Sequence, residues 1–273
     1  MIGNRALVAT SLAAAALVLA ACSSNSSSGS PSASATPSND DGYQHGANWS
    51  YAGDTGPGNW GNLSPDYAAC ATGKAQAPID IPSPTATSTT LPTINYHGTS
   101  GTVVNDGHKI QMNVQDATSS LTLEGKKYVL EQVHYHSPSE NTLAGQSFPL
   151  EFHFVHAASD GTGAVLAVFI TPGSANPAWQ PFIDAAQKVQ PGENDSMAIP
   201  ISWGQLANGL SRSLQFDGSL TTPPCDEGIK WVVNPVPVTM SQAQIDALTS
   251  VYSGNARPIQ SLNGREISID KKQ

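Results

Sequence analysis

The sequence has little charge, and most of the charge that it has is negative. Only 12% of the 273 residues are charged, and 12 Lys and Arg stand against 21 Asp and Glu, which gives a formal net charge of −9 at pH 7. An acidic surface of this kind repels phosphate backbones and anionic lipid headgroups. We therefore expect no nucleic-acid partner.

The sequence also lacks an apolar run long enough to cross a membrane, which takes about 20 residues. The run at the N-terminus extends only from Ala6 to Ala21, after the basic residue Arg5. A short apolar run behind a positive charge is typical of a secretion signal. It ends in Leu-Ala-Ala-Cys, which resembles the bacterial lipobox, so we expect residues 1–21 to be a lipoprotein signal peptide and Cys22 to be lipidated. An ordinary signal peptide cut near Ala21 is the alternative.

Residues 22–45 are rich in Ser and Pro and poor in large apolar side chains. Such a segment cannot bury enough apolar area to fold, so we expect a flexible tether. Residues 46–273 are then one domain, because no later linker or internal repeat divides them. A lipid on Cys22 would anchor this domain to the bacterial cell membrane on its extracytoplasmic side. We therefore expect an exported protein.

Cysteine is scarce, with three residues in the whole chain. With Cys22 lipidated, Cys70 and Cys225 remain. An even pair of cysteines in an exported protein is a candidate disulfide. Two free buried thiols are the alternative.

Proline and glycine are frequent by contrast, with 20 and 24 residues. They occur along the chain beside many Thr and Val, which favours strands and loops over long helices. Alternating apolar residues predict several strands between residues 94 and 171, and a continuous apolar run predicts a strand buried on both faces at Ala164–Thr171. Two short helices are expected at Pro177–Val189 and Ser241–Ser250. The predicted fold class is therefore mainly β with minor helices.

Histidine is concentrated in one part of the chain, since five of the seven lie between His108 and His156. His134 and His136 share one face of a predicted strand, and His153 lies in the next strand. If these strands pair as a hairpin, three imidazoles converge on one point and suit a zinc ion at about 2.0–2.1 Å per bond. Three protein ligands leave the fourth position open for water, which is typical of a catalytic zinc site.

Two polar side chains share the same strand faces, Gln132 with His134 and Glu151 with His153. Each can accept the remaining ring N–H of a histidine ligand and so fix its tautomer. The alternative interpretation is that the histidines are simply exposed on strands.

A cupin metal site is a second alternative, because His134, His136 and Glu140 have the spacing of the cupin motif, in which the Glu is also a ligand. The second half of a cupin, with a fourth histidine further along the chain, is missing here. No histidine follows His156.

Six short segments carry a more specific signal. They are Gln76–Ile81 (Q-A-P-I-D-I), Asn105–His108 (N-D-G-H), Gln132–Glu140, Glu151–His156 (E-F-H-F-V-H), Ser219–Pro224 (S-L-T-T-P-P) and Asn255–Pro258 (N-A-R-P). In this order they resemble the motifs of the α-class carbonic anhydrases, and the resemblance extends over residues 47–268. It implies a twisted, largely antiparallel central sheet with minor helices and a conical cavity.

The resemblance implies a zinc-dependent carbonate dehydratase, in which zinc-bound hydroxide converts carbon dioxide reversibly to bicarbonate and a proton. The family is itself the standard example of zinc lowering the pKa of a bound water to about 7. Carried over position by position, the zinc ligands are His134, His136 and His153. Gln132 and Glu151 then orient His134 and His153.

The resemblance also implies the catalytic residues. Thr221 accepts a hydrogen bond from the hydroxide and donates one to Glu140. His108 is the proton shuttle, a role that suits histidine because its ordinary pKa is about 6.5. The free N–H of His136 goes to a backbone carbonyl near Asn255.

Five further residues are implied on the substrate side of the site. They are Thr222 for bicarbonate, and Val155, Val165, Leu220 and Trp231 as the apolar wall for carbon dioxide. Cys70 and Cys225 match the disulfide of exported bacterial members.

Three positions depart from the family motifs: Asn141 where a His is often seen, Phe216 where a Tyr is common, and Ala77 in place of Ser. None of them is an expected metal ligand, so activity is still expected. His156 lies on the strand face opposite His153, which predicts a structural role. The alternative function is a non-catalytic binding module with the same fold. Such relatives generally lose a zinc-ligating histidine, and all three remain here.

Overall fold

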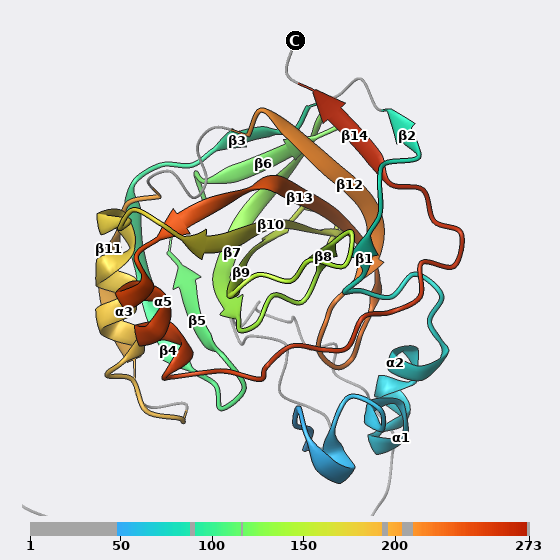
Figure 1. Cartoon of the computed structure of the whole chain (residues 1–273), viewed down its shortest axis with the longest axis horizontal. Helices are drawn as coiled ribbons and strands as arrows, with labels where there is room; N and C mark the ends of the chain where they lie inside the picture. The colour runs from blue at the N-terminus through green and yellow to red at the C-terminus, as the bar shows by residue number, and fades with distance from the viewer. Residues whose placement is uncertain (1–47, 88–90, 116, 193–195, 204–209, 272–273) are drawn as a thin grey trace, which may run out of the picture. The chain divides into compact units, whose positions relative to one another are not determined.

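The computed structural model describes residues 48–87, 91–115, 117–192, 196–203 and 210–271 (Figure 1). The predicted signal peptide, Cys22 and the tether of residues 22–45 lie outside the described residues, so they stay predictions. Within the described part of the chain, no helix is both long enough and apolar enough to cross a membrane.

Strands make up most of the regular structure. In chain order they are β1 (Asp80–Ile81), β2 (Ala86–Thr87), β3 (Thr93–Asn95), β4 (Thr99–Asn105), β5 (Ile110–Val114), β6 (Ser120–Leu123), β7 (Lys126–His136), β8 (Thr142–Leu143), β9 (Leu150–Ala157), β10 (Gly163–Pro172), β11 (Ser196–Ile201), β12 (Arg212–Ser219), β13 (Glu227–Met240) and β14 (Ser268–Lys271). The helical segments are short. They are η1 (Gly53–Thr55), α1 (Trp60–Leu63), η2 (Pro65–Tyr67), α2 (Ala69–Thr72), η3 (Pro177–Trp179), α3 (Gln180–Ala186) and α5 (Gln242–Thr249).

The strands form a 12-stranded sheet and a separate 2-stranded sheet of β1 and β8. The main path of the large sheet runs β11-β4-β5-β7-β9-β10-β13-β12-β14-β2, and β6 joins β7 and β3 beside it. Most neighbours are antiparallel, but β10 with β13 and β14 with β2 run parallel. Figure 1 shows β7, β9 and β10 in the middle of this sheet. The prediction of a twisted, largely antiparallel sheet with minor helices is confirmed.

Two hairpin turns form at the dipeptides Asp106-Gly107 and Glu124-Gly125, and Asp-Gly is a typical hairpin turn sequence. Between β6 and β7, Glu124 and Gly125 have φ values of 52° and 80°, the positive angles that a tight hairpin turn requires. Between β4 and β5, Gly107 has a φ of 88°. Strand β5 begins only at Ile110, three residues after Gly107. The reason is that Asp106 Oδ1 accepts hydrogen bonds from the backbone N–H groups of residues 108 and 109 and so extends the turn.

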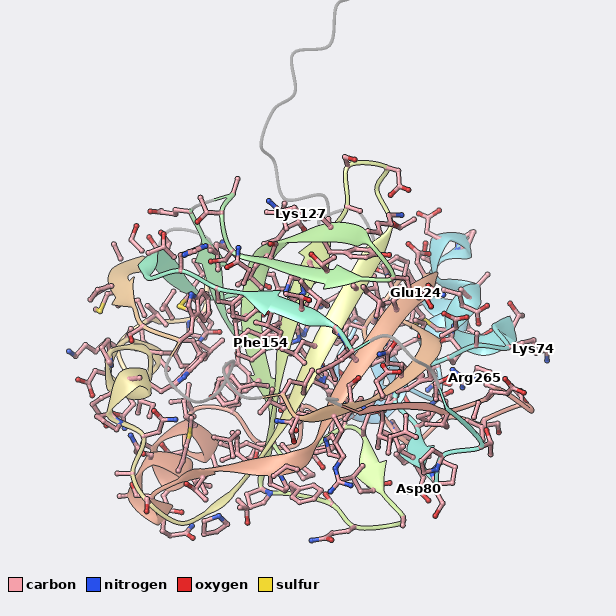
Figure 2. The ribbon with its side chains drawn as sticks, turned by 90° about the horizontal axis from the view of Figure 1, so that it is seen from above. Lys74, Asp80, Glu124, Lys127, Phe154 and Arg265 are labelled. Atoms are coloured by element: carbon pink, nitrogen blue, oxygen red, sulfur yellow. A yellow bond between two sulfur atoms is a disulfide. The ribbon has the colours of Figure 1, made fainter. Side chains whose placement is uncertain are left out.

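The large sheet separates two apolar clusters. Helices α3 and α5 cover one face, where the larger cluster includes Tyr135, Phe152, Phe154, Phe182 and Ile245. The smaller cluster includes Val165, Ala167, Phe169, Phe216 and Trp231. Figure 2 shows Phe154 in the interior, whereas Glu124 and Lys127 lie at the surface. As alternating strand residues point to opposite faces, β7, β9 and β10 contribute side chains to both clusters.

The two predicted helices are confirmed with shorter bounds. Residues 177–189 contain η3 and α3, which ends at Ala186. Helix α5 begins after Ser241, whose Oγ accepts from the backbone N–H of Gln244 at 3.2 Å, while Gln244 Oε1 accepts from the Ser241 N–H at 3.2 Å. This reciprocal capping box satisfies two backbone donors that the first turn leaves free.

Candidate metal centre

The pairing of β7 with β9 brings the three predicted ligands together. The strands are antiparallel, with His134 opposite His153 and His136 opposite Glu151. The hairpin expected from the sequence is therefore present. In the part of the chain that the structure describes, these three histidines form a group whose ligand atoms all lie within 4.8 Å of one another, and all three side chains are buried.

A register shift in β7 sets which face the histidines occupy. The pairing with β9 shifts between Leu130 and Gln132, so Glu131 is the extra residue of a β-bulge. Leu130 packs in the larger cluster, as do Val133 and Tyr135. Without the bulge, Leu130 and Gln132 would share a face; with it, Gln132 turns to the metal side. A bulge of this kind re-aims the side chains that follow it.

The protein contacts of His134 and His136 leave the same ring nitrogen free on each. Nδ1 of His134 lies 2.8 Å from Gln132 Oε1, and Nδ1 of His136 lies 2.6 Å from the backbone oxygen of Asn255. Oxygen atoms of amides and carbonyls only accept, so both Nδ1 atoms carry the proton. The lone pair of each ring is then on Nε2, which points to the shared centre. The predicted contacts with Gln132 and with a carbonyl near Asn255 are both present.

His153 has the opposite arrangement. Its Nε2 lies 3.2 Å from Glu151 Oε1, close enough for an ion pair but off the line of a regular hydrogen bond. Its Nδ1 faces the centre. Glu151 is buried, and Asn141 holds both of its oxygens: the backbone N–H donates to Oε2 at 2.7 Å and the side-chain Nδ2 donates to Oε1 at 2.8 Å.

Buried polar atoms without hydrogen-bond partners indicate that these residues fit a zinc ion. His136 Nε2 and Glu140 Oε2 lie 3.3 Å apart, are fully buried, and have no hydrogen-bond partner among the described residues. A buried polar atom without a partner is costly, so unsatisfied atoms that converge on one point call for a cation there. Burial lowers the pKa of His134 and of His136 well below the ordinary value, and the neighbouring histidine rings add to this. Neutral imidazoles are the form that binds zinc.

Glu140 is fixed beside the ligands by the segment near the C-terminus. Its Oε1 accepts from the backbone N–H of Arg257 at 2.8 Å. Burial raises the pKa of Glu140 to about 7, while His153, the Arg257 N–H and a hydrogen bond with the Thr221 side chain act in the opposite direction. The predicted Glu140–Thr221 pair is therefore in contact, and both side chains are buried.

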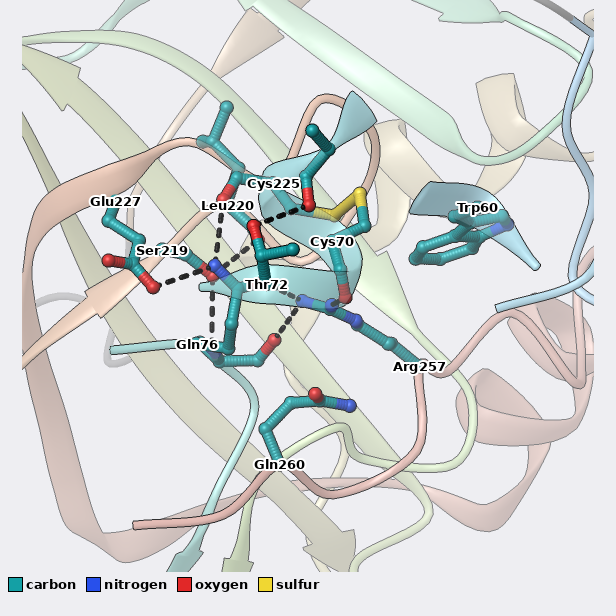
Figure 3. The surroundings of a disulfide bond; sticks show 12 residues. Trp60, Cys70, Thr72, Gln76, Ser219, Leu220, Cys225, Glu227, Arg257 and Gln260 are labelled. Atoms are coloured by element: carbon teal, nitrogen blue, oxygen red, sulfur yellow. Dashed lines mark hydrogen bonds between the residues drawn. A yellow bond between two sulfur atoms is a disulfide. The ribbon is translucent and has the colours of Figure 1, made fainter. Parts of the chain in front are cut away.

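Thr221 lies in the loop of residues 220–226, which is tied down at several points. The disulfide between Cys70 and Cys225 joins this loop to α2 (Figure 3). Gln76 Nε2 donates to the Cys225 carbonyl at 3.0 Å, and Arg257 donates to the Cys70 carbonyl and to Gln76 Oε1. The predicted disulfide is confirmed, and these contacts connect it through Arg257 to Glu140.

His108 lies half-buried at the turn between β4 and β5. Its ring stacks on Trp49, with centroids 3.8 Å apart and planes 11° from parallel. Burial lowers the pKa of His108 below its ordinary value, and the Asp106 carboxylate partly offsets this. Sequence reasoning did not identify Trp49 as a partner. No motif in the sequence marks Trp49 as a partner of His108.

The predicted apolar wall lies on the metal side of the sheet. Val165 and Trp231 are buried in the smaller cluster and Val155 packs against it, while Leu220 and Thr222 are half-buried. Trp231 contacts the His153 ring edge-on, with centroids 5.0 Å apart. Phe216, the departure from Tyr, stacks on Trp231 at 5.7 Å and so belongs to this wall.

His156 is a structural residue, as predicted. Its Nδ1 lies 3.2 Å from the carbonyl of Ala164 and its Nε2 lies 2.6 Å from the hydroxyl of Tyr96. Both ring nitrogens therefore have protein partners. Burial lowers its pKa to about 4.

Comparison with known proteins agrees with this site. The family model for eukaryotic-type carbonic anhydrase matches residues 55–271. The chain belongs to this family. A carbonic anhydrase of Pectobacterium carotovorum is 40% identical over 244 residues, which cover 86% of this chain and 93% of the relative. A carbonic anhydrase of Neisseria gonorrhoeae is 37% identical over 224 residues, covering 80% and 86%.

Solved structures of the family have the same fold. The α-carbonic anhydrase from Thermovibrio ammonificans, solved in complex with the inhibitor sulfanilamide, superposes with a TM-score of 0.75 at 36% identity and covers 82% of this chain and 100% of its own. With the histidine triad in place, the chain is a zinc-dependent lyase whose reaction is the reversible hydration of carbon dioxide. The cupin alternative is wrong, because Glu140 bonds to Arg257 and Thr221 in a carbonic anhydrase fold.

Proposed function

We propose that hydration takes place at the point shared by His134, His136 and His153, and that these side chains hold the zinc ion. The observation that carries this proposal is the buried Nε2 of His136, which lies beside an equally unpartnered oxygen of Glu140. When bound, zinc supplies the Lewis acidity that makes water a nucleophile at neutral pH, an effect for which carbonic anhydrase is the standard example.

Thr221 and Glu140 orient the attacking oxygen. Glu140 is held by the Arg257 N–H and hydrogen-bonds the Thr221 side chain. A carboxylate only accepts, so the hydroxyl of Thr221 donates a hydrogen bond to Glu140 and presents a lone pair to the reacting oxygen. The O–H of the reacting oxygen then points at Thr221. One of its lone pairs therefore faces the substrate carbon. Thr222, the next residue of the loop, hydrogen-bonds the bicarbonate product.

Carbon dioxide is apolar and waits against Val155, Val165, Leu220 and Trp231. Three of these side chains belong to or pack against the smaller apolar cluster, on the same sheet face as the histidines. An apolar wall also excludes ordered water from the carbon that is attacked. After bicarbonate leaves, a water molecule takes its place and must lose a proton to restore the nucleophile, and that proton must reach solvent.

His108 exports that proton. It is half-buried, lies at the turn between β4 and β5 rather than in a strand, and stacks on Trp49, so part of its side chain reaches solvent. Its pKa is lowered by burial, so at neutral pH the ring is in the unprotonated form that can accept the proton.

We also propose that this carbonic anhydrase works outside the cytoplasm, held at a membrane surface by a lipid on Cys22. The N-terminal lipobox-like sequence and the Ser- and Pro-rich residues 22–45 support this. The Cys70–Cys225 disulfide fits an oxidising compartment. Expression in a bacterial host of the wild type and of Cys22→Ala tests it: the wild type should fractionate with membranes and the variant should not. Equal membrane retention of both would overturn the anchor.

The test of the catalytic proposal is stopped-flow hydration of carbon dioxide with and without a zinc chelator. The expected result is activity that the chelator removes and added zinc restores. The competing candidate, a binding module of the same fold, predicts no chelator-sensitive activity.

A further inference from the structure

Asn141 is linked to the metal centre by a chain of contacts that runs through Glu151 to His153. It is fully buried, and it stands where a histidine is often seen in the family. Its side-chain Oδ1 accepts from the backbone N–H of Ile79 at 3.0 Å. Its Nδ2 donates to Glu151 Oε1 at 2.8 Å, and that same carboxylate oxygen lies 3.2 Å from His153 Nε2.

The orientation of the Asn141 amide is fixed by chemistry. A backbone N–H can only donate, so the atom that faces Ile79 must be the amide oxygen. The amide nitrogen then necessarily faces Glu151. The backbone N–H of Asn141 also donates to the other oxygen of the carboxylate, at 2.7 Å. One residue therefore supplies two donors to Glu151 and leaves the carboxylate no freedom to rotate.

A fixed carboxylate has a direct consequence for His153. With Oε1 held in place, the only favourable tautomer of the imidazole has its proton on Nε2, toward Glu151. The lone pair then lies on Nδ1, on the side that faces the other two ligands. If Glu151 could turn, the ring could also take the opposite tautomer and lose its ability to bind metal in this pose.

We propose that Asn141 is a positioning residue for the third zinc ligand, acting through Glu151 on His153. This rests on the proposed assignment of His153 as a ligand. The amide also joins Ile79, next to β1, to the metal centre, so the small β1–β8 sheet serves as the frame against which the third ligand is held.

The competing explanation is that Asn141 merely satisfies buried polar groups and stabilises the fold. Zinc affinity of the folded chain separates the two. Asn141→Leu keeps a branched side chain but removes the amide, and Asn141→Asp keeps an acceptor for Ile79 while removing the donor to Glu151. The matched control is Gln244→Leu. Gln244 is also a buried amide, with bonds to Asn176 and Ser241, and it lies in α5, which covers the opposite face of the sheet.

The experiment measures zinc dissociation from the full chain against a competing chelator, together with the visible spectrum of the cobalt-substituted protein, which reports ligand geometry. We expect both Asn141 variants to bind zinc about 10- to 100-fold more weakly and to change the cobalt spectrum. Gln244→Leu should lower thermal stability but keep wild-type affinity and spectrum. If either Asn141 variant fails to fold, the other carries the comparison.

Wild-type zinc affinity and an unchanged cobalt spectrum in the Asn141 variants would overturn the positioning role and leave only a structural one. A wild-type chain that binds no zinc would be a different result. It would overturn the metal assignment of the three histidines, and this inference with it.

Discussion

Two histidines three residues apart on β9, His153 and His156, occupy opposite faces of the sheet. Both are buried. His156 has protein partners at both ring nitrogens, the hydroxyl of Tyr96 and the carbonyl of Ala164. His153 has Glu151 beside one nitrogen, and its other nitrogen faces the point shared by the other two ligands.

This comparison shows what distinguishes a metal ligand from a core histidine. A lowered pKa does not, because burial lowers the pKa of His156 to about 4 and that of His134 and His136 well below the ordinary value. All of these rings are neutral at pH 7. The difference is the second ring nitrogen. In a core histidine it has a hydrogen-bond partner in the protein, whereas in a metal ligand it has none and points toward the free nitrogens of the other ligands.

The largest expected difference in activity is between the alanine variants of His153 and His156. His153→Ala should lose all chelator-sensitive hydration activity, because two imidazoles remain where three are needed. His156→Ala should keep the activity per folded molecule, although it should be less stable because the hydroxyl of Tyr96 loses its partner. Stopped-flow rates normalised to folded protein check both. Loss of activity in His156→Ala at full folding would remove the distinction.

The loop residue Thr221 should give the next largest effect. Thr221→Ala removes the acceptor that orients the attacking oxygen and should lower kcat/KM about 10²-fold, the scale for losing one transition-state hydrogen bond. Thr221→Ser keeps the hydroxyl and should retain most of the activity. Equal rates for alanine and serine at this position would reject the orienting role.

His156, on the face of the sheet opposite the metal centre, should make the free energy of unfolding depend on pH. The folded state keeps the ring neutral down to a pKa of about 4, whereas the unfolded chain takes up a proton near the ordinary value. The unfolded state therefore binds more protons between these values. The contribution is complete above about pH 6.5, is lost as pH falls toward about 4, and amounts to about 3 kcal/mol.

Urea unfolding of the wild type and of His156→Gln, at pH values from 7 to 4, measures this contribution. The difference in unfolding free energy between the two proteins should shrink as the pH falls. Because both proteins share the metal ligands, loss of zinc at low pH cancels in the difference. A constant difference across this range would contradict the burial of a neutral His156.

The smallest effect is expected at His108. His108→Ala should lower kcat about 10-fold while leaving kcat/KM nearly unchanged, because water and buffer still carry part of the proton flux. Added imidazole should restore much of the loss. An unchanged kcat in weak buffer would remove His108 as the shuttle.

The ligands and the central hairpin could be predicted because the information is local. Alternation along a strand puts His134 and His136 on one face, and the next strand brings His153 opposite them. The turn residues between β6 and β7 and the Ser241 cap are equally local. The full length of strand β13 is not predictable from its pattern, because prolines at positions 235 and 237 interrupt the alternation. The parallel pairing of β10 with β13 joins segments far apart in the sequence.

The supporting contacts could not be predicted for the same reason. Arg257 joins Cys70, Gln76 and Glu140 across separations of more than a hundred residues, and only its motif hinted at a role. The β-bulge at Glu131 cannot be predicted from the residue types around it. The sequence shows Asn141 only as a departure from the family motif, and its contacts with Ile79 and Glu151 show how it reaches the ligands.

The most direct test of this account is the amount of zinc bound per folded chain in the purified protein. We expect about one zinc per chain, retained in His156→Ala and lost in His153→Ala. A folded wild-type protein that is purified with no zinc bound, or a His153→Ala variant that keeps a full equivalent, would contradict the metal assignment.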